Sequence, residues 1–158
     1  MTNNPDVSVV MAVYNGQQYV EESINSILSQ SYSNFEFIIV DDGSNDLTSQ
    51  ILLDAQSKDK RIFLITNETN KGISYSLNSA IAISRGEYIA RMDSDDIAIS
   101  NRLELQLEFL RKHSECVIVG GKIEVIGDSA HTVEINQFSD WYNQHSHSED
   151  IKKAIIYR

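Results

Sequence analysis

The stretch YIARMDSDD, residues Tyr88–Asp96, decides how the rest of the chain is interpreted. Its apolar first part predicts a buried strand, which ends in three carboxylates within four residues, Asp93, Asp95 and Asp96. Crowded carboxylates repel one another and hold their water, so such a cluster does not stabilise a fold. Mg²⁺ and Mn²⁺ prefer oxygen ligands and often bind through one or two carboxylates plus substrate phosphates. The motif is therefore typical either of a metal site for a phosphate-bearing substrate or of a solvated turn before a helix.

Apolar runs and helical stripes alternate on both sides of this stretch. Strands are expected over Val7–Tyr14, Phe35–Val40, Arg61–Thr66 and Tyr88–Met92. A helix is expected after each strand. The inner faces of these helices would carry, in chain order, Val20, Ile24, Ile27 and Leu28; Leu47, Ile51, Leu52 and Ala55; Ile73, Leu77, Ala80 and Ile81; and Leu103, Leu107 and Leu110. We expect the second helix to begin near Asn45, Arg85-Gly86 to end the third, and strand-like runs at Cys116–Gly121 and Lys122–Ile126. The alternation predicts an α/β fold, a mostly parallel sheet with helices on both faces in three layers, in a single domain over residues 1–158.

Composition excludes several classes of protein. The chain has 158 residues, a net charge of −10 and a pI of about 4.7, so it carries no basic footprint for nucleic acid and no polybasic membrane patch. Its single cysteine, Cys116, forms no internal disulfide, which fits a reducing compartment. The polar start of the chain lacks a signal-peptide pattern, and no apolar run is long enough to span a membrane. We therefore expect a cytoplasmic location.

Three polar turns follow strands of the predicted sheet. Tyr14-Asn15 follows the first strand, Asp41-Asp42-Gly43-Ser44 the second, and Asp93-Ser94-Asp95-Asp96 the fourth. Ligands of open α/β sheets bind beyond the carboxyl ends of the strands, so these turns are expected to converge on one site. Taken singly, Tyr14 is favoured as a packing residue, and Asp42 could start the next turn or cap a helix. The convergence favours a functional site over a solvated turn.

A series of motifs in the correct order resembles the family 2 glycosyltransferases. The motifs are Val9–Gly16, Ile27–Ser31, Val40–Ser44, Asn70-Lys71-Gly72 with Leu77-Asn78, and Gly86–Asp96, so the resemblance covers about Ser8 to Gly121. It implies a GT-A fold and an inverting sugar transfer from a nucleotide-diphosphate sugar, often UDP-linked, to a glycan or lipid-linked acceptor, as in the biosynthesis of cell walls and polysaccharides. Ala12 stands where the family usually has proline.

The resemblance also implies roles for individual residues. Tyr14 would stack on the base, Asp42 would bond the edge of the base, Asp93 would reach the ribose and sugar, and Asp95 would ligate Mn²⁺ or Mg²⁺ with Asp93. The implied nucleotide-binding set is Ala12, Tyr14, Asn15, Asp42, Gly72, Asn78, Arg91, Asp93 and Ser94, and the implied metal ligands are Asp95 and Asp93.

The family places its catalytic base well downstream of the metal carboxylates, and no convincing base follows Gly121. His131, His145, His147 and the pair Glu149-Asp150 show no recognisable placement. We therefore expect the chain to be the donor-binding front of a longer enzyme, inactive by itself, with its base beyond Arg158 and with any membrane association provided by segments beyond this chain.

Three alternatives stay open at this point. A nucleotidyltransferase would also use paired carboxylates and a metal, although Asn15-Gly16-Gln17-Gln18 is a poor phosphate loop. A phospho-receiver domain is indicated by Asp41-Asp42 but leaves the carboxylates after the fourth strand unexplained. A non-catalytic nucleotide-binding domain is the third.

Overall fold

The structure, a computed structural model, describes residues 4–124, 126, 140 and 143. The chain divides into two compact units, Met1–Glu108 and Phe109–Arg158. The first unit carries the sheet and every turn identified above as a candidate site, so it is the unit on which the functional argument depends.

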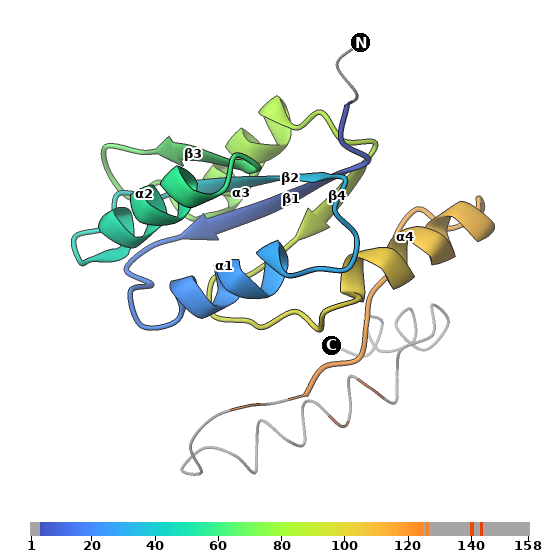
Figure 1. Ribbon diagram of the computed structural model, residues 1–158. Coiled ribbons are helices and arrows are strands. Elements are labelled where there is room, and N and C mark those ends of the chain that lie inside the picture. Colours follow the sequence, from blue (N-terminus) through green and yellow to red (C-terminus); the bar gives the residue numbers. More distant parts are fainter. Residues whose placement is uncertain (1–3, 125, 127–139, 141–142, 144–158) are drawn as a thin grey trace, which may run out of the picture. The chain divides into compact units, whose positions relative to one another are not determined.

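The first unit contains a four-stranded parallel sheet. Its strands are β1 (Val7–Val13), β2 (Phe35–Asp41), β3 (Ile62–Thr66) and β4 (Tyr88–Arg91), in the order β3-β2-β1-β4. The register pairs Val7 with both Phe35 and Tyr88, and Phe37 with Ile62. Because all pairs are parallel, the four carboxyl ends lie at one edge of the sheet (Figure 1). The expected parallel sheet is confirmed.

Helices cover both faces of the sheet, as expected. One core cluster joins the odd-numbered residues of β1 to α1 (Val20–Leu28), α2 (Thr48–Lys58) and the buried Leu103 and Leu107 of α4 (Arg102–Lys112). A smaller cluster on the opposite face joins Val10 to α3 (Ile73–Ile83). Successive strand residues point to opposite faces, so this division follows from the alternation of side chains along β1. All seven residues of β2 are buried, which explains the continuous apolar run in its sequence.

β4 differs from the expectation of a buried strand. It lies at the edge of the sheet and its residues alternate between half-buried and exposed, with Ile89 45% exposed. An apolar run alone does not distinguish a central strand from an edge strand, because both favour β-branched and aromatic residues.

Several local expectations are wrong, among them the inner-face positions of Ile73 and Ile81, which are 53% and 45% exposed. α2 begins at Thr48 rather than near Asn45, and Leu47 is exposed instead of lying on the inner face. The described residues of Cys116–Gly121 and Lys122–Ile126 form no strand, and Val117 is 95% exposed. A strand needs a hydrogen-bonding partner, which an apolar run by itself does not supply.

Gly86 does not end a helix, contrary to expectation. α3 ends at Ile83, and Ser84 after it is extended. A Cβ on Gly86 would lie 2.5 Å from the backbone nitrogen of Ser8, and the Gly86 N–H donates to Ser8 Oγ at 2.8 Å. Glycine is therefore needed here because the chain passes directly against β1.

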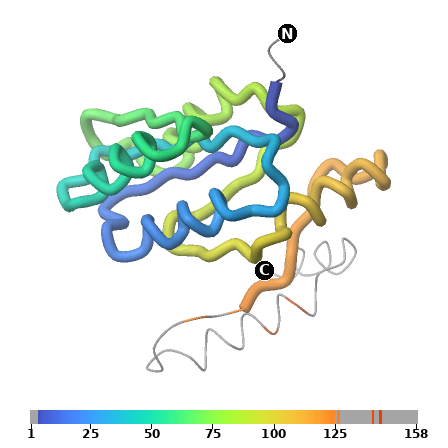
Figure 2. Tube along the Cα trace, in the orientation of Figure 1, coloured from blue at the N-terminus to red at the C-terminus, as the bar shows by residue number. Residues whose placement is uncertain are grey.

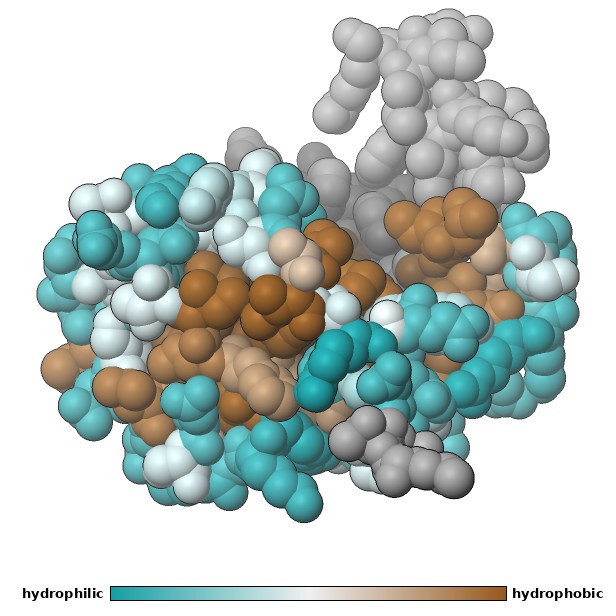
Figure 3. Space-filling model, turned by 90° about the horizontal axis from the view of Figure 1, so that it is seen from above, coloured by the Kyte–Doolittle hydropathy of each residue, from teal (hydrophilic) through white to brown (hydrophobic). Residues whose placement is uncertain are grey.

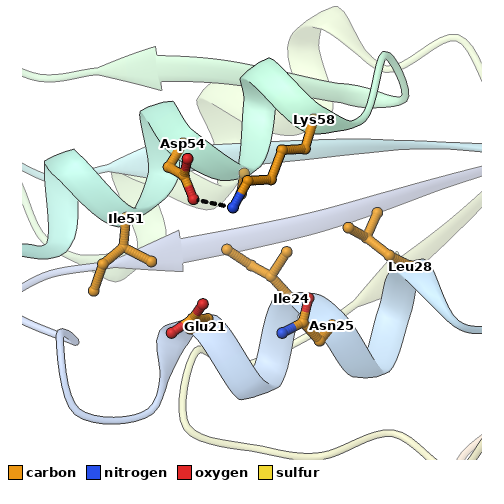
Figure 4. A pocket seen from close by; sticks show the side chains of 8 residues that line it. Glu21, Ile24, Asn25, Leu28, Ile51, Asp54 and Lys58 are labelled. Carbon is orange, nitrogen blue, oxygen red and sulfur yellow. Dashed lines mark hydrogen bonds and ion pairs between the residues drawn. The ribbon is translucent and has the colours of Figure 1, made fainter.

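The surface of the first unit includes a shallow groove between α1 and α2 (Figure 4). Its lining residues are Glu21, Ile24, Asn25, Leu28, Ile51, Asp54, Ala55 and Lys58. Asp54 and Lys58 form an ion pair of 2.5 Å at its rim. A view from above shows apolar residues at the surface among polar ones (Figure 3), and the exposed apolar residues of α3 include Ile73, Ile81 and Ile83. Within the described part of the chain, no helix has the length and apolar character that a membrane crossing needs.

Candidate functional site

The turns after β1 and β2 are bound to each other by hydrogen bonds. The Asn15 N–H donates to Ser44 Oγ at 3.0 Å, and the Asn45 N–H donates to Asn15 Oδ1 at 2.8 Å. Asn15 has a φ of +53°, a left-handed conformation that asparagine tolerates better than most residues. The backbone of Asn15 thus turns the chain after β1, and its side chain binds the turn after β2 by a hydrogen bond.

Further bonds continue this connection as far as the start of α2. The Gly16 N–H donates to Thr48 Oγ1 at 2.9 Å, and the Leu47 N–H donates to Gln17 Oε1 at 3.0 Å. The Asp46 carboxylate accepts the N–H groups of Gln17 at 3.2 Å and Thr48 at 3.0 Å. Burial would raise the pKa of Asp46, but a hydrogen bond from the Thr48 side chain, followed by these backbone N–H bonds, outweighs burial and lowers the pKa. The turns after β1 and β2 are therefore held together by a continuous set of hydrogen bonds.

The loop between β3 and α3 is also connected to the turn after β2, through the side chain of Asp42. Its side chain is buried, and Oδ1 accepts hydrogen bonds from Asn67 Nδ2 at 2.7 Å and the Lys71 N–H at 3.0 Å. Oδ2 accepts the Gly72 N–H at 2.8 Å. Burial would raise the pKa of Asp42, yet the donors around it hold the pKa below its usual value. Asp42 is thus a charged anchor for the loop that precedes α3.

Two glycines permit this arrangement. Gly43 has a φ of +77°, and a Cβ there would lie 2.8 Å from the backbone of Thr69. Gly72 has a φ of +88° but has open space where a Cβ would lie. The positive φ therefore favours glycine at position 72.

Asp41, the other member of the acidic pair, is 1% exposed. Its Oδ1 accepts the Ser44 N–H at 3.0 Å, and its Oδ2 accepts the Ser49 hydroxyl. Both carboxylates of the Asp41-Asp42 pair are thus occupied by internal hydrogen bonds, which does not favour the receiver-domain alternative.

The carboxylates after β4 are far more open. The Asp93 side chain is 41% exposed, and its Oδ1 accepts hydrogen bonds from Arg91 Nε at 3.1 Å and Nη2 at 2.8 Å. Asp95 and Asp96 are exposed. Burial, and then the charges of Asp93 and Asp95, raise the pKa of Asp96, although Arg102 and Arg91 oppose this. The negative charges of Asp93 and Asp95 thus act on Asp96 in addition to its burial.

This carboxylate turn fits a divalent cation by its chemistry. The described residues contain no ready-made group of three or more His, Cys, Asp or Glu side chains arranged around a metal position. Mg²⁺ often takes only one or two protein carboxylates and completes its shell with waters and substrate phosphates, so Asp95 and Asp93 suffice as protein ligands. Negative charges gathered in one turn favour a cation beside them.

Arg102 supports the end of β4 from the start of α4. Its Nη2 donates to the backbone carbonyl of Arg91 at 2.8 Å, and its Nε donates to Gln106 Oε1 at 3.3 Å. Burial lowers the pKa of Arg102, while the charges of Asp96 and Asp93 raise it. A positive charge therefore lies behind the carboxylate turn as well as beside it, at Arg91.

The structure brings together most of the expected site residues. Ala12 is at the end of β1, and Tyr14 follows it with 45% of its surface exposed. A Cβ on Gly16 would lie 3.7 Å from Ser94 Oγ, so the turn after β1 adjoins the turn after β4. Gly72 is bonded to Asp42, but Asn78 lies further along α3, exposed, about 7.5 Å along the helix axis from Ile73. Among the described residues, Asn78 makes no side-chain hydrogen bond to these turns.

Sequence reasoning missed several buried polar residues around these turns. Asn67 donates to both Asp42 Oδ1 and Ser76 Oγ, the latter at 3.0 Å. Ser23, Ser26 and Gln30 are buried on one side of α1 and its C-terminal extension. Their spacing of three and four residues, beside the apolar stripe of α1, was a signal that these polar residues share a face.

The candidates for a catalytic base fall outside the described residues. These are His131, His145, His147, Glu149 and Asp150. Their predicted lack of a role stays a prediction.

Comparison with known proteins adds a family. The family model described as "Glycosyl transferase family 2" matches residues 8–156. An uncharacterized glycosyltransferase of Haemophilus influenzae is 38% identical over 160 residues, covering 99% of this chain and 49% of the relative. The Escherichia coli protein WfgD, named as a UDP-Glc:alpha-D-GlcNAc-diphosphoundecaprenol beta-1,3-glucosyltransferase, is 38% identical over 124 residues, covering 78% of this chain and 48% of the relative. The chain spans about half the length of these relatives.

Solved structures agree with the fold. TarS of S. aureus superposes with a TM-score of 0.70 at 29% identity, covering 79% of this chain and 23% of TarS. Residues 1–349 of TarS in complex with UDP-GlcNAc give a TM-score of 0.65 at 31% identity, covering 69% of this chain and 32% of that one. A mannosyltransferase of Pyrobaculum calidifontis, solved with GDP-Man and Mn²⁺, gives 0.63 at 24% identity, covering 69% and 33%. The expected GT-A fold is confirmed.

Proposed function

The chain belongs to glycosyl transferase family 2, and from that membership we propose that it forms the donor-binding part of a glycosyltransferase. The donor is a nucleotide-diphosphate sugar, UDP-linked in our proposal, and the acceptor is a glycan or a lipid-linked sugar. The observation that carries the proposal is the convergence of the turns after β1, β2 and β4 at one edge of the sheet, with Gly16 beside Ser94 and Asn15 bonded to Ser44.

The nucleotide would bind across the turns after β1 and β2. Tyr14 offers an exposed ring for stacking on the base, and Asp42 offers a carboxylate for the base edge. The Gly72 backbone and Arg91 lie at the margins of the same edge. TarS has been solved with UDP-GlcNAc, and it shares this fold at 31% identity, which supports a UDP-linked donor over other nucleotides.

Asp95 and Asp93 would hold a divalent cation, Mn²⁺ or Mg²⁺. When bound, the cation would neutralise the charge that develops on the leaving diphosphate. A chain with a net charge of −10 repels an anionic donor unless such neutralisation occurs at the site. The mannosyltransferase solved with Mn²⁺ supports this choice of metal.

The proposed transfer is a single displacement with inversion. The oxygen of an acceptor hydroxyl forms a bond to the anomeric carbon, the bond from that carbon to the diphosphate oxygen breaks, and a carboxylate base takes the hydroxyl proton. Asp93, Asp95 and Asp96 lie on the diphosphate side in this arrangement, so the base comes from elsewhere in the protein. The lipid-diphosphate acceptor in the name of WfgD supports a lipid-linked acceptor, and with it a cytoplasmic protein that acts at a membrane surface.

The test is calorimetry of UDP binding to the 158-residue chain with Mn²⁺, Mg²⁺ or a chelator. We expect affinity between millimolar and micromolar, present only with metal. Asp95→Ala should abolish the metal dependence, and Tyr14→Ala should weaken binding by roughly 1–3 kcal/mol, the value of a stacked base. Equal binding of UDP in chelator would refute the role of the metal. A non-catalytic domain would bind UDP in the same way. Sugar transfer by the protein that contains this chain would exclude that alternative.

A further inference from the structure

One side of α1 is polar, and it contacts the segment that carries the metal carboxylates. Ser23 is 1% exposed, and its Oγ donates to the backbone carbonyl of Asp93 at 2.9 Å, 70 residues away in sequence. Figure 2 shows the segment after β4, in yellow, running beside the blue α1. The contact reaches the residue at which the carboxylate turn begins.

Two more residues on that side of α1 hold the rest of the segment. Ser26 Oγ accepts the Ala98 N–H at 3.0 Å. Gln30 Nε2 donates to the Ile99 carbonyl at 2.7 Å, and Gln30 Oε1 accepts the Leu103 N–H at 3.0 Å. The segment from Asp93 to Leu103 is therefore fixed at both ends by α1 and its C-terminal extension.

Between these fixed ends, Asp95 is left open. In residues 4–124, no hydrogen bond to its carboxylate is formed, and its side chain is exposed. Arg91 holds the Asp93 carboxylate, Arg102 holds the carbonyl at the end of β4, and Ser23 holds the Asp93 carbonyl. The backbone of the carboxylate turn is thus fixed at Asp93, while the carboxylate oxygens of Asp95 stay accessible.

We propose that Ser23 is a positioning residue for the metal site, acting through the backbone of Asp93. This inference rests on the proposed function, since it needs Asp93 and Asp95 as metal ligands. Mg²⁺ demands nearly ideal octahedral geometry, so a turn held in place before binding loses less freedom when the metal binds. Residues that orient metal ligands commonly matter about 10–100-fold for affinity.

The neighbouring serines show that Ser23 is not an ordinary helix serine. A serine inside a helix usually bonds a carbonyl of the preceding turn, as Ser26 does to Ser23 at 2.7 Å and Ser29 does to Ser26 at 3.3 Å. Ser23 instead gives its hydroxyl proton to a residue from another element. Ser29 is therefore a control for the loss of a serine hydroxyl at the end of the same helix, where it is exposed and forms only a local bond, and urea unfolding controls for the burial of Ser23.

The experiment compares Mn²⁺ binding by the 158-residue chain with Ser23→Ala and Ser29→Ala, measured as free Mn²⁺ by electron paramagnetic resonance with saturating UDP. We expect Ser23→Ala to raise the Kd for Mn²⁺ about tenfold, and Ser29→Ala to leave it within about twofold. Urea unfolding of each variant without metal shows whether the chain is folded under the conditions of the titration. Should Ser23→Ala fail to fold, Ser23→Cys keeps nearly the same volume, replaces the hydroxyl with a weak donor and is judged by the same criteria.

An unchanged Kd for the Ser23 variant overturns the proposal, and so does an equal rise for both variants, which would reflect general destabilisation. Absence of Mn²⁺ binding by the unaltered chain is a different result, because it refutes the metal site of the proposed function itself. Recovery of UDP affinity in Ser23→Ala at about tenfold higher Mn²⁺ would confirm that the substitution acts on the metal and leaves the nucleotide contacts intact.

Discussion

Replacing Asp42 with asparagine tests whether this carboxylate anchors the loop before α3. The substitution keeps the size of the side chain but changes one acceptor oxygen into an NH₂ group. The new amide would keep its oxygen toward Asn67 Nδ2 and the Lys71 N–H, which gives two bonds, and would turn its NH₂ toward the Gly72 N–H. Two donors would then face each other at a position that is 3% exposed.

The magnitude follows from these three contacts. The Gly72 N–H would lose Asp42 but keep Asn70 Oδ1 at 3.0 Å, so its loss lies at the low end of the about 1–3 kcal/mol of an unpaired N–H. The two remaining bonds each lose about 1 kcal/mol when their acceptor becomes neutral. A neutral amide is also easier to bury than a carboxylate, which offsets part of the loss. We therefore expect Asp42→Asn to lower the free energy of unfolding by about 2–3 kcal/mol.

Urea unfolding followed by circular dichroism measures this change. With an m-value of about 2 kcal/mol per molar, the midpoint should fall by about 1–1.5 M urea. Asp54→Asn is the control, because Asp54 pairs with an exposed lysine one helical turn away and its loss should leave the midpoint unchanged. If Asp42→Asn behaves like Asp54→Asn, the three hydrogen bonds do not hold the loop and the reasoning is wrong.

Three further predictions concern acid stability, packing and turnover. Burial would raise the pKa of Glu36, but hydrogen bonds from Ser8 and Arg85 lower this pKa in the folded chain. The ionised Glu36 therefore stabilises the fold fully above about pH 4.5, and this stabilisation is lost as the pH falls through the lowered folded pKa. In urea titrations, Glu36→Gln should lose less stability than the unaltered chain between about pH 7 and about pH 3. Gly86→Ala should lower the free energy of unfolding by about 1–3 kcal/mol in the same assay, because its Cβ would press on the backbone of β1. Gly72→Ala is the comparison, because a Cβ there meets open space and only the positive φ is unfavourable. In the proposed arrangement the carboxylates after β4 lie on the diphosphate side, so the 158-residue chain should bind a UDP-sugar but not transfer the sugar to an acceptor; transfer of radiolabelled sugar by this chain would contradict this.

Sequence patterns predicted the central strands well because those strands are buried on both faces. β1 was expected over Val7–Tyr14 and spans Val7–Val13, and β2 was expected over Phe35–Val40 and spans Phe35–Asp41. A strand covered on both sides has few positions that tolerate polar residues, so its sequence shows a continuous apolar run. The convergence of the turns followed from the parallel order of the strands, which the same runs predicted.

The errors arose where local sequence does not contain the deciding contact. The partner of a strand determines whether an apolar run such as 116–121 becomes a strand, and Ile89 is exposed because β4 has a neighbour on one side only in the described sheet. Gly86 shows the same limit, since the residue that demands glycine there is Ser8, 78 positions earlier. Side-chain partners at such separations depend on the fold and are not visible in a local pattern.

The anchoring role of Asp42 is compatible with its proposed contact to the base. A carboxylate offers about four lone-pair positions. Oδ1 uses two of them, for Asn67 and Lys71, Oδ2 uses one, for Gly72, and the Ser76 hydroxyl also bonds the carboxylate, so a base N–H would share an oxygen with one of these donors. The lowered pKa favours the ionised form of Asp42, which is a pure acceptor and would select a ring N–H over a ring nitrogen without a proton. The contacts that fix the loop before α3 would thus also fix the direction from which a base can donate, and a substitution that disturbs the loop should change nucleotide preference together with stability.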